Sequence, residues 1–574
     1  MQNAEIAKIF RETAELLELK GENIFKVRAY QNAARNIENL PRDLAEAYKE
    51  GGIKALTDIP GIGQSIAEHI EEMVKTGKFR KYHDLAGEFP KGFLKLIEIP
   101  GLGPKTAMLL YKQMGIDSPE KLEKAAKAGK LAGLPGFGEK KQKNIISGIE
   151  LKKKVKGRYL LSEAAQYLEA ILAKLRPIKG IEEILPCGSF RRSKDTIGDL
   201  DILVTSQHPK VVMDTFVKLP QVDRVLAHGE TKSSIVFKNG LQADLRVLEP
   251  AVFGSAAHYF TGSKQHNILI REMAIKKGLK VSEYGVFKGE KRIAGQTEED
   301  VFKALGLPYI PPEIREGTGE IEAALKGELP DLIELKDIRG DLQMHSKFSD
   351  GANTIEEMVE HAKGLGYEYI AITDHTKSTR IAGGQSEKDF LKELEYIEKL
   401  NKRLKGFKVL KGVEVDILPD GSLDYKDEVL KQVDVVVAAV HSNFKMNRQD
   451  MTKRILTAAK NKYVNIISHP TGRLIGRRDP YEIEVEALLQ AAKDTGTYLE
   501  LNCQPERMDL EDIYCRSAVE KKVKLSIDTD AHSREQLNFM KFGAAYARRG
   551  WVTEKDVINT LPFDKLLRAL YIKR

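Results

Sequence analysis

The chain has 574 residues, of which 31% are charged, and a formal net charge of +8. This length exceeds that of a usual single domain, so we expect several folding units. No apolar run is long enough to cross a bilayer, and the charged, amphipathic N-terminus lacks the layout of a signal peptide. The three cysteines, Cys187, Cys503 and Cys515, are too few and too scattered for a disulfide framework. The composition argues against a membrane protein or a disulfide-rich secreted protein, and it predicts a cytoplasmic one.

Residues 1–150 have the pattern of short helices joined by Gly-Pro turns, and three similar phrases recur there. They are IPGIGQSIAEHI from Ile59, IPGLGPKTAMLL from Ile99 and LPGFGEKKQKNI from Leu134. Each Gly-x-Gly pair permits a tight turn that presents backbone N–H groups to an anion at the positive end of a helix. Residues 91–158 carry 16 Lys and Arg against 6 Asp and Glu. On charge alone a solvated lysine-rich face is an alternative, but the repeated turns favour binding of a phosphate backbone. The predicted contact positions are Gly61, Gly63, Gly101, Gly103, Lys105, Gly136 and Gly138.

The stretch GSFRRSKDTIGDLDIL, residues 188–203, places two aspartates in a predicted strand. Asp199 and Asp201 are two residues apart, so their carboxylates share one face, about 7 Å apart along the strand. Like charges at this spacing repel unless a cation lies between them; the alternative is that each caps a turn. Asp244 in LQADLRVL is the expected third carboxylate of a two-metal site for phosphoryl transfer. The preceding turn, GSFRR, offers backbone N–H, hydroxyl and guanidinium groups suited to a triphosphate.

These motifs, together with HYFTGSKQHN and SEYGVF, resemble those of family X DNA polymerases, of which DNA polymerase beta is the best known. The resemblance extends from the N-terminus to about Pro312. It implies that Asp199, Asp201 and Asp244 bind two Mg²⁺ (or Mn²⁺) ions and that Asp244 takes the proton from the primer 3′-hydroxyl. The implied nucleotide-binding residues are Arg158, Gly188, Ser189, Arg192, Gly198, Tyr259, Phe260, Gly262, Lys264 and Asn267. The implied DNA contacts of this region are Arg246 and Arg271.

The chain departs from the family pattern at three positions in this part. Lys264 stands where the beta enzyme has an acidic residue beside the incoming base, and we expect it to tighten nucleotide binding. Gln242 stands where an arginine often precedes the third aspartate. The family's Schiff-base lysine falls at His69, and a histidine cannot form the imine needed for β-elimination. We therefore expect gap recognition without efficient lyase chemistry by the usual route.

Other N-terminal positions match the family's contacts with DNA and with cations. Lys26 and Lys81 match basic positions suited to a 5′-phosphate. The resemblance also implies that backbone carbonyls of the first two hairpins hold a monovalent cation. These carbonyls belong to Thr57, Ile59, Ile62, Ile97, Ile99 and Leu102.

After about residue 336, strand and helix patterns alternate, which predicts a parallel α/β barrel or a doubly wound sheet. The carboxyl ends of parallel strands meet at one edge, so polar residues at those ends should converge. The residues in question are His345, Asp374, His375, Glu414, His441, His469, Asp530 and His532. One such histidine would more often be structural, whereas eight residues at matching places indicate a multinuclear Zn²⁺ or Mn²⁺ centre that activates water against a phosphate.

This half of the chain, roughly residues 336–569, resembles the PHP (polymerase and histidinol phosphatase) family, a distorted TIM-like (β/α)7 barrel with a trinuclear site. The resemblance places the metal ligands at His345, Asp350, His375, Glu414, His441, His469, Asp530 and His532. Of these, we also expect His345, His375 and His469 to act in catalysis, and Asn502 and Arg507 to orient the substrate. The first motif usually reads His-x-His but here begins with Gln343, so one ligand is weak or absent. The implied activity is a 3′–5′ exonuclease, with abasic-site endonuclease or 3′-phosphatase activity as further options.

We therefore predict a multidomain α/β protein with six parts. They are a lyase-like helical domain (1–88), a helix-hairpin-helix subdomain (89–157), a nucleotidyltransferase palm (158–254), a thumb-like subdomain (255–315), a linker (316–336) and the PHP domain (337–574). The predicted function is template-directed filling of short gaps, with gapped or nicked DNA and deoxynucleoside triphosphates as substrates and a monomer as the active form. The alternatives are a template-independent nucleotidyltransferase and a DNA-binding scaffold with an inactive PHP domain.

Overall fold

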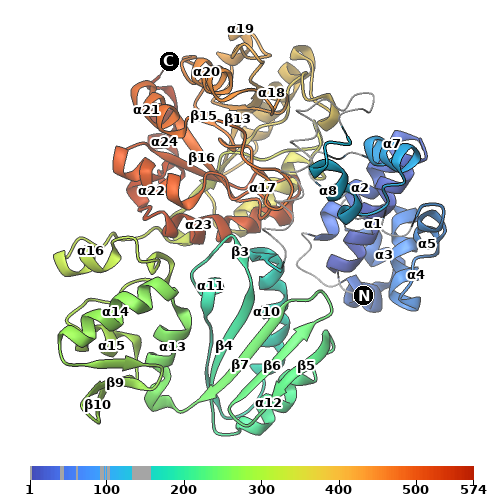
Figure 1. Ribbon diagram of the computed structural model, residues 1–574. Coiled ribbons are helices and arrows are strands. Elements are labelled where there is room, and N and C mark those ends of the chain that lie inside the picture. Colours follow the sequence, from blue (N-terminus) through green and yellow to red (C-terminus); the bar gives the residue numbers. More distant parts are fainter. Residues whose placement is uncertain are drawn as a thin grey trace.

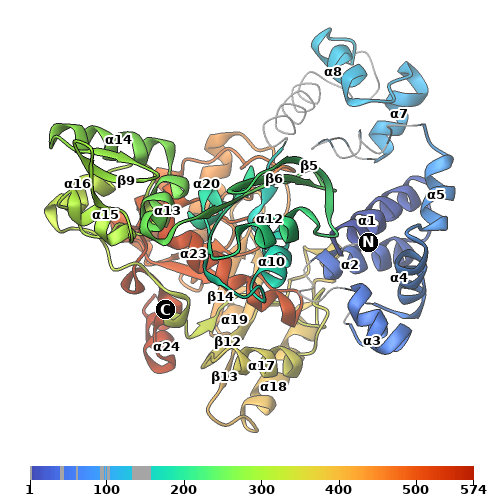
Figure 2. The same ribbon diagram turned by 90° about the horizontal axis from the view of Figure 1, so that it is seen from below.

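The computed structural model describes residues 3–38, 44–59, 62–90, 93, 96, 99, 102, 104–131 and 157–573. The C-terminal domain lies against the palm and the thumb, and the N-terminal helices lie to one side of them (Figure 1; the view from below is Figure 2). None of the helices within the described residues is long and apolar enough to span a membrane.

The N-terminal part is helical, as predicted. Its described helices are α1 (Asn3–Leu19), α2 (Ile24–Glu38), α3 (Leu44–Thr57), α4 (Gln64–Thr76), α5 (Arg80–Gly87), α7 (Pro104–Met114) and α8 (Pro119–Lys127). The first two repeated phrases share an equivalent hydrogen bond: Ile62 N donates to the Ile59 carbonyl at 3.1 Å, and Leu102 N donates to the Ile99 carbonyl at 3.0 Å. The third phrase lies outside the described residues.

The palm is a five-stranded mixed sheet in the order β2-β4-β7-β6-β5, in which β4 and β7 run parallel. Its elements are β1 (Tyr159–Leu160), α10 (Leu161–Leu175), β2 (Ile181–Pro186), α11 (Gly188–Arg191), β3 (Thr196–Ile197), β4 (Asp199–Ser206), α12 (Pro209–Val217), β5 (Val222–His228), β6 (Lys232–Phe237) and β7 (Gln242–Leu248). Leu200, Ile202 and Val204 of β4 belong to the same core as the buried residues of α10 and α12. Asp199 and Asp201 therefore occupy the opposite face of the strand.

The thumb follows, with elements α13 (Phe253–Thr261), α14 (Lys264–Lys276), β8 (Lys280–Ser282), β9 (Gly285–Lys288), β10 (Lys291–Ala294) and α15 (Glu298–Ala304). The segment predicted to be a linker contains a further helix, α16 (Glu320–Lys326). Ile321 and Ala324 of this helix share a core with Phe302 of the thumb and Trp551 of the C-terminal domain. In addition, Glu320 is buried against His266, with 2.7 Å between Oε1 and Nδ1. The connection is therefore packed against both of the domains that it joins.

The C-terminal domain, described in full from residue 337 to 573, is a parallel barrel of seven strands in sequential order. The strands are β11 (Gly340–Asp341), β12 (Tyr369–Ile372), β13 (Lys408–Asp416), β14 (Val435–Ala439), β15 (Ile466–Ile467), β16 (Tyr498–Asn502) and β17 (Leu525–Asp528). A parallel bridge between Met344 and Ala531 connects the chain just after β11 to that just after β17, so the sheet nearly closes. This confirms the predicted fold class.

Helices surround this barrel (Figure 1). They are α17 (Ile355–Gly364), α18 (Glu387–Asn401), α19 (Asp427–Leu430), α20 (Arg448–Ala459), α21 (Val485–Thr495), α22 (Asp512–Lys521), α23 (Met540–Arg549) and α24 (Phe563–Tyr571). Strands covered on both faces should be apolar throughout, and all five residues of β14, VVVAA, are indeed buried. On the side of the palm, Phe542 of α23 packs against the palm core.

Candidate active sites

Three carboxylates meet on two neighbouring palm strands. Asp201 of β4 pairs in register with Asp244 of β7, and Asp199 lies two residues before Asp201 on the same face. Gln242 Nε2 donates to Asp244 Oδ1 at 2.9 Å, and Lys232 Nζ lies 3.0 Å from Asp244 Oδ2. Gln242 and Lys232 therefore support Asp244 in place of the arginine that often precedes the third aspartate in the family pattern.

The negative charges of the three carboxylates repel one another. Burial, followed by the charges of Asp199 and Asp244, raises the pKa of Asp201 to about 7. Burial also acts to raise the pKa of Asp244, but hydrogen bonds from Gln242, Lys232 and Ser234 hold it below its usual value. Because two ionised carboxylates make ionisation of the third unfavourable, the site is suited to a divalent cation. Such a cation would stabilise the ionised form of Asp201.

The predicted triphosphate turn, α11, packs directly on Asp201. Gly188 has a φ of +62°, and a Cβ at this position would lie 2.7 Å from Asp201 Oδ2, so only glycine fits here. Cys187 N donates to the Asp201 carbonyl at 2.7 Å and fixes the start of the turn. Ser189, the next residue, is partly exposed.

The two arginines predicted to bind the triphosphate are both held by neighbouring groups. Arg158 Nε donates to Thr196 Oγ1 at 3.0 Å, and its guanidinium lies beside Gly198. Arg192 Nε lies 3.0 Å from Glu316 Oε1, and its Nη1 donates to the carbonyl of Thr261. The structure thus places Arg192 at the end of α11 and Arg158 beside Thr196 and Gly198.

The predicted nucleotide-binding residues of the thumb flank the junction of α13 and α14. Asn267 Nδ2 donates to the carbonyl of Tyr259 at 2.8 Å, which brings these two positions together. The ring of Phe260 lies under the Arg246 guanidinium, 4.6 Å from ring centroid to Cζ. Gly262 has a φ of +70° between the two helices. Lys264 and Arg271 are exposed on α14, and Arg271 Nε donates to the Asn267 carbonyl at 3.1 Å.

The barrel brings seven of the eight predicted metal ligands into three overlapping sets, and the ligand atoms of each set lie within 4.8 Å of one another. The sets are His345, Asp350, His375 and His532; His375, Glu414 and His441; and His345, Glu414 and Asp530. The eighth residue, His469, lies alongside, with Nε2 3.4 Å from Glu414 Oε1. Among the described residues, such compact sets form only at this end of the barrel.

Glu414 is the centre of this arrangement. Its oxygens lie 3.0 to 3.5 Å from His345, His375, His441 and His469. Both oxygens are nevertheless buried, and neither makes a hydrogen bond within the described residues. Burial acts to raise the pKa of Glu414, but the neighbouring histidines hold it well below its usual value, so the carboxylate is ionised. An ionised, buried carboxylate surrounded by imidazole nitrogens fits a bridging ligand of a Zn²⁺ or Mn²⁺ centre.

Several supporting residues were not predicted. Asp416 Oδ1 lies 3.3 Å from His441 Nδ1, and its Oδ2 accepts a hydrogen bond from Thr379 Oγ1 at 2.7 Å. Glu500 Oε2 accepts the backbone N–H of His469 at 2.6 Å. Asp416 follows Glu414 by two residues on one strand, so the alternation in GVEVD carried a signal for it. Glu500 precedes Asn502 by two residues on β16, so the same alternation carried a signal for it.

Four other residues singled out in this domain have distinct surroundings. Asp374 accepts hydrogen bonds from Ser346 N at 2.8 Å and from Ser346 Oγ at 2.5 Å, so it stabilises a turn and is not part of the ligand sets. Asn502 Nδ2 donates to Asp530 Oδ2 at 3.0 Å. Arg507 Nε lies 3.7 Å from the same oxygen. Gln343 is fully buried, and neither amide atom has a hydrogen-bond partner among the described residues.

In the N-terminal domain, His69 and Lys81 meet at Tyr30. Lys81 Nζ donates to Tyr30 Oη at 2.7 Å, and Tyr30 Oη lies 3.3 Å from His69 Nδ1. Lys26 pairs with Glu22 at 3.1 Å on the exposed side of α2. Gly63 is the N-cap of α4. The predicted positions Gly61, Ile97, Gly101, Gly103, Gly136 and Gly138 and the side chain of Lys105 lie outside the described residues.

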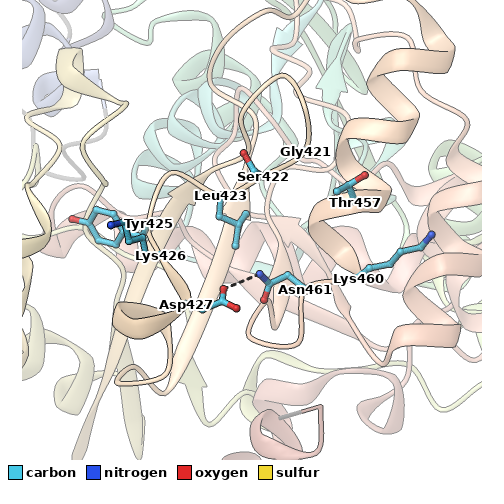
Figure 3. A pocket seen from close by; sticks show the side chains of 9 residues that line it. All are labelled: Gly421, Ser422, Leu423, Tyr425, Lys426, Asp427, Thr457, Lys460 and Asn461. Carbon is cyan, nitrogen blue, oxygen red and sulfur yellow. Dashed lines mark hydrogen bonds between the residues drawn. The ribbon is translucent and has the colours of Figure 1, made fainter.

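An open cavity of about 440 Å³ lies elsewhere on the barrel domain, between the segment 421–427 and the end of α20 (Figure 3). Asn461 donates to Asp427 across it at 3.2 Å. Lys426 and Lys460 are its basic residues, and it contains none of the predicted metal ligands. The cavity is therefore separate from the candidate metal centre.

The fold and the two sites define a nucleotidyltransferase palm joined to a metal-binding barrel, and comparison with protein families supports this. Residues 1–79 match the helix-hairpin-helix domain, and residues 93–152 match the SAM-like helix-hairpin-helix tandem. Residues 161–250 match the DNA polymerase beta palm, residues 256–316 the DNA polymerase beta thumb and residues 341–504 the PHP domain.

Curated relatives show the same combination. The chain is 39% identical over 566 residues to "DNA polymerase/3′-5′ exonuclease PolX" of Bacillus subtilis, covering 97% of each chain. It is 30% identical to rat DNA polymerase lambda over 291 residues, 45% of this chain and 48% of that one. It is also 30% identical to a probable phosphatase of Thermoanaerobacter sp. over 218 residues, 36% of this chain and 84% of that one. A crystal structure of Leishmania infantum polymerase beta is 24% identical, with a TM-score of 0.26, and covers 39% of this chain and 100% of that one. The chain belongs to the family X DNA polymerases of the PolX type, which carry a C-terminal PHP domain.

Proposed function

We propose that this protein is a template-directed DNA polymerase that fills short gaps during DNA repair, and that its PHP domain is a metal-dependent 3′–5′ exonuclease. The observation that carries the first activity is the register pairing of Asp201 with Asp244, beside Asp199, under a glycine-serine turn. The observation that carries the second is the overlapping ligand sets around Glu414. The name of the Bacillus subtilis relative combines the same two activities.

At the palm, Asp199, Asp201 and Asp244 would hold two divalent cations, Mg²⁺ or Mn²⁺. Bound cations at such a site lower the pKa of the primer 3′-hydroxyl and stabilise the charge on the phosphates. Asp244, which Gln242 and Lys232 keep ionised, would accept the hydroxyl proton. Arg192, Ser189 and Gly188 would hold the triphosphate, with Arg158 and Gly198 at its side. Tyr259, Phe260, Gly262, Lys264 and Asn267 would contact the sugar and base of the incoming nucleotide.

At the barrel, the eight predicted ligands would hold Zn²⁺ or Mn²⁺ ions, which supply an activated water for attack on a terminal phosphodiester. Asn502 and Arg507 both contact Asp530, so they would orient this ligand as well as the substrate. Gln343 stands in place of one histidine, and we expect that position to bind its metal more weakly than imidazole would. The relative named as a probable phosphatase supports removal of 3′-phosphates as a second candidate activity.

The remaining residues would contact DNA. The N-terminal hairpins, with their carbonyl groups at Thr57, Ile59, Ile62, Ile97, Ile99 and Leu102, would bind the phosphate backbone through a monovalent cation. Lys26 and Lys81 would bind the 5′-phosphate of a gap, and Arg246 and Arg271 would contact the template and primer. We expect the active form to be a monomer on gapped or nicked DNA.

A pair of variants tests the two activities separately. Asp199→Ala combined with Asp201→Ala should abolish extension of a one-nucleotide gap while leaving Mn²⁺-dependent digestion of a 3′ end. His375→Ala should do the reverse. Extension that survives the double aspartate change would refute the palm assignment, and digestion that survives His375→Ala would show that the barrel is not the nuclease. Omitting the template strand distinguishes templated from template-independent addition.

A further inference from the structure

Four charged side chains connect the predicted triphosphate turn to the barrel domain. Arg192 Nε of the palm lies 3.0 Å from Glu316 Oε1, and Arg549 Nη1 donates to the same oxygen at 2.8 Å. Arg549, the last residue of α23, also pairs with Asp512 of α22, with Nη2 2.7 Å from Oδ2. Positive and negative charges therefore alternate from α11 across the domain boundary to α22, where Figure 1 shows α23 facing the palm.

Arg549 also contacts the turn directly, because its Nη1 donates to the backbone carbonyl of Arg192 at 2.7 Å. Its side chain is only 3% exposed, and that of Glu316 is 19% exposed. Burial acts to raise the pKa of Glu316, but the charges of Arg549, Arg192 and Lys194, whose Nζ lies 3.8 Å from Glu316 Oε1, hold it below its usual value. The carboxylate therefore remains ionised, and its attraction to both arginines is weakly screened by water and salt.

These contacts fix the plane of the Arg192 guanidinium. Nε faces Glu316, and Nη1 donates to the carbonyl of Thr261, just before Gly262. A Cβ at Gly262 would lie 3.1 Å from Nη1, so this glycine gives the guanidinium room to lie there. Within the described part of the chain, the hydrogen bonds of this group use Nε and Nη1. Nη2 is therefore the guanidinium nitrogen left to donate to a further acceptor, such as a phosphate oxygen.

We propose that Glu316 and Arg549 are positioning residues of the polymerase reaction, through which the PHP domain holds Arg192 in the orientation that receives the triphosphate of the incoming nucleotide. The inference rests on the proposed role of Arg192 in binding that triphosphate. An arginine that is held in place before the nucleotide arrives loses less side-chain freedom on binding. The PHP domain would thereby serve the polymerase site as well as its own.

The test is steady-state extension of a one-nucleotide gap by the full-length chain. Arg549→Ala and Glu316→Gln should each raise the KM for the nucleotide about tenfold, the size of a coupling between neighbouring charges, with a much smaller change in kcat. The double variant should be about as affected as either single one, since both act through Arg192. Digestion of 3′ ends by the barrel should persist and shows that each variant is folded. Glu316→Gln keeps the side-chain shape, so it remains informative if Arg549→Ala folds poorly.

Arg548→Ala is the matched control. Arg548 Nε lies 2.7 Å from Glu313 Oε1, and its Nη1 donates to the Ile333 carbonyl at 3.0 Å, so it contacts the connection between the domains without touching Arg192. Its KM for the nucleotide should match that of the wild type. An equal rise in KM for Arg548→Ala would attribute the effect to domain docking and overturn the proposal.

Arg192→Ala separates this inference from the proposed function on which it rests. If this variant leaves the KM unchanged, the assignment of Arg192 fails, and the inference fails with it. If Arg192→Ala raises the KM while Arg549→Ala and Glu316→Gln do not, the assignment of Arg192 holds and the inference alone is overturned.

Discussion

Asp416 offers the sharpest test of the barrel centre, because it supports a metal ligand without being one of the predicted ligands. Its Oδ1 lies 3.3 Å from His441 Nδ1. Burial acts to lower the pKa of His441, but Glu414 and Asp416 together raise it to about 10. A metal at Nε2, which lies 3.4 Å from Glu414, would displace the proton of that nitrogen, while Asp416 accepts the hydrogen bond from the proton that stays on Nδ1.

Asp416→Asn removes the charge and keeps the shape, so the hydrogen bond from Thr379 can persist. Loss of a carboxylate behind a histidine ligand costs about 10- to 100-fold in metal affinity, or about 1.4 to 2.7 kcal/mol. We expect the Mn²⁺ concentration for half-maximal 3′ digestion to rise by this factor, with digestion recovering at high Mn²⁺. Extension of a gapped duplex should not change.

Asp424→Asn is the control for this prediction. Asp424 is also buried, and its carboxylate accepts hydrogen bonds from Thr376 Oγ1 at 2.8 Å, Ser378 N at 3.0 Å and the backbone N–H of Asp416 at 3.1 Å. It therefore supports the backbone at Asp416 without a hydrogen bond to His441 within the described residues, and it separates support of the backbone from support of the imidazole. Its Mn²⁺ dependence should stay close to that of the wild type. An unchanged curve for Asp416→Asn, or an equal shift for Asp424→Asn, would show that the support of His441 by Asp416 does not tune the metal centre.

Four further outcomes are expected. Because the pKa of Asp201 is raised to about 7, a proton competes with Mg²⁺ for this carboxylate below that pH. The Mg²⁺ affinity measured by calorimetry should therefore fall as the pH decreases, by up to about tenfold per pH unit. An affinity that does not change with pH would contradict this prediction. Lys264→Ala should weaken nucleotide binding, and an unchanged affinity would remove the role of that lysine. Borohydride treatment with an abasic 5′-phosphate substrate should give no adduct at His69, as peptide mapping would show. Gln343→His should tighten Zn²⁺ more than Mn²⁺ in a competition titration, since imidazole suits Zn²⁺ better than an amide oxygen does; equal changes would contradict the reasoning.

Much of both sites could be predicted from local geometry. The two-residue period of a strand placed Asp199 and Asp201 on one face, and the parallel pairing of β4 with β7 set Asp244 opposite Asp201. At the barrel, eight residues at the carboxyl ends of parallel strands were expected to converge, and six of them do so in compact sets. Both predictions depend only on strand direction and side-chain alternation, which the sequence pattern reveals.

Side-chain alternation predicts less well which way a residue points where the chain leaves a strand. Asp374 and His375 are adjacent in YIAITDH, and neighbouring residues of an extended chain point to opposite sides. His375 joins two ligand sets, whereas Asp374 binds the turn at Ser346. The strand pattern placed both at the barrel end, but the choice between them depends on the path of the following turn.

The contact between the triphosphate turn and the PHP domain could not be predicted, because no local sequence feature marks the residues that make it. Glu316 is 124 residues from Arg192 and 233 residues from Arg549 along the chain. Each is an ordinary charged residue in the sequence, and charged residues at the surface usually contribute little. Their importance arises only when the packed connection carrying α16 brings the thumb, the palm turn and α23 together. Because these groups are buried, each one needs its neighbour of opposite charge. A buried arginine left without its carboxylate would strongly destabilise the fold. The alternating charges therefore come together only when the domains are packed. A substitution of one of these charges in either domain should affect the position of the Arg192 side chain at the triphosphate turn.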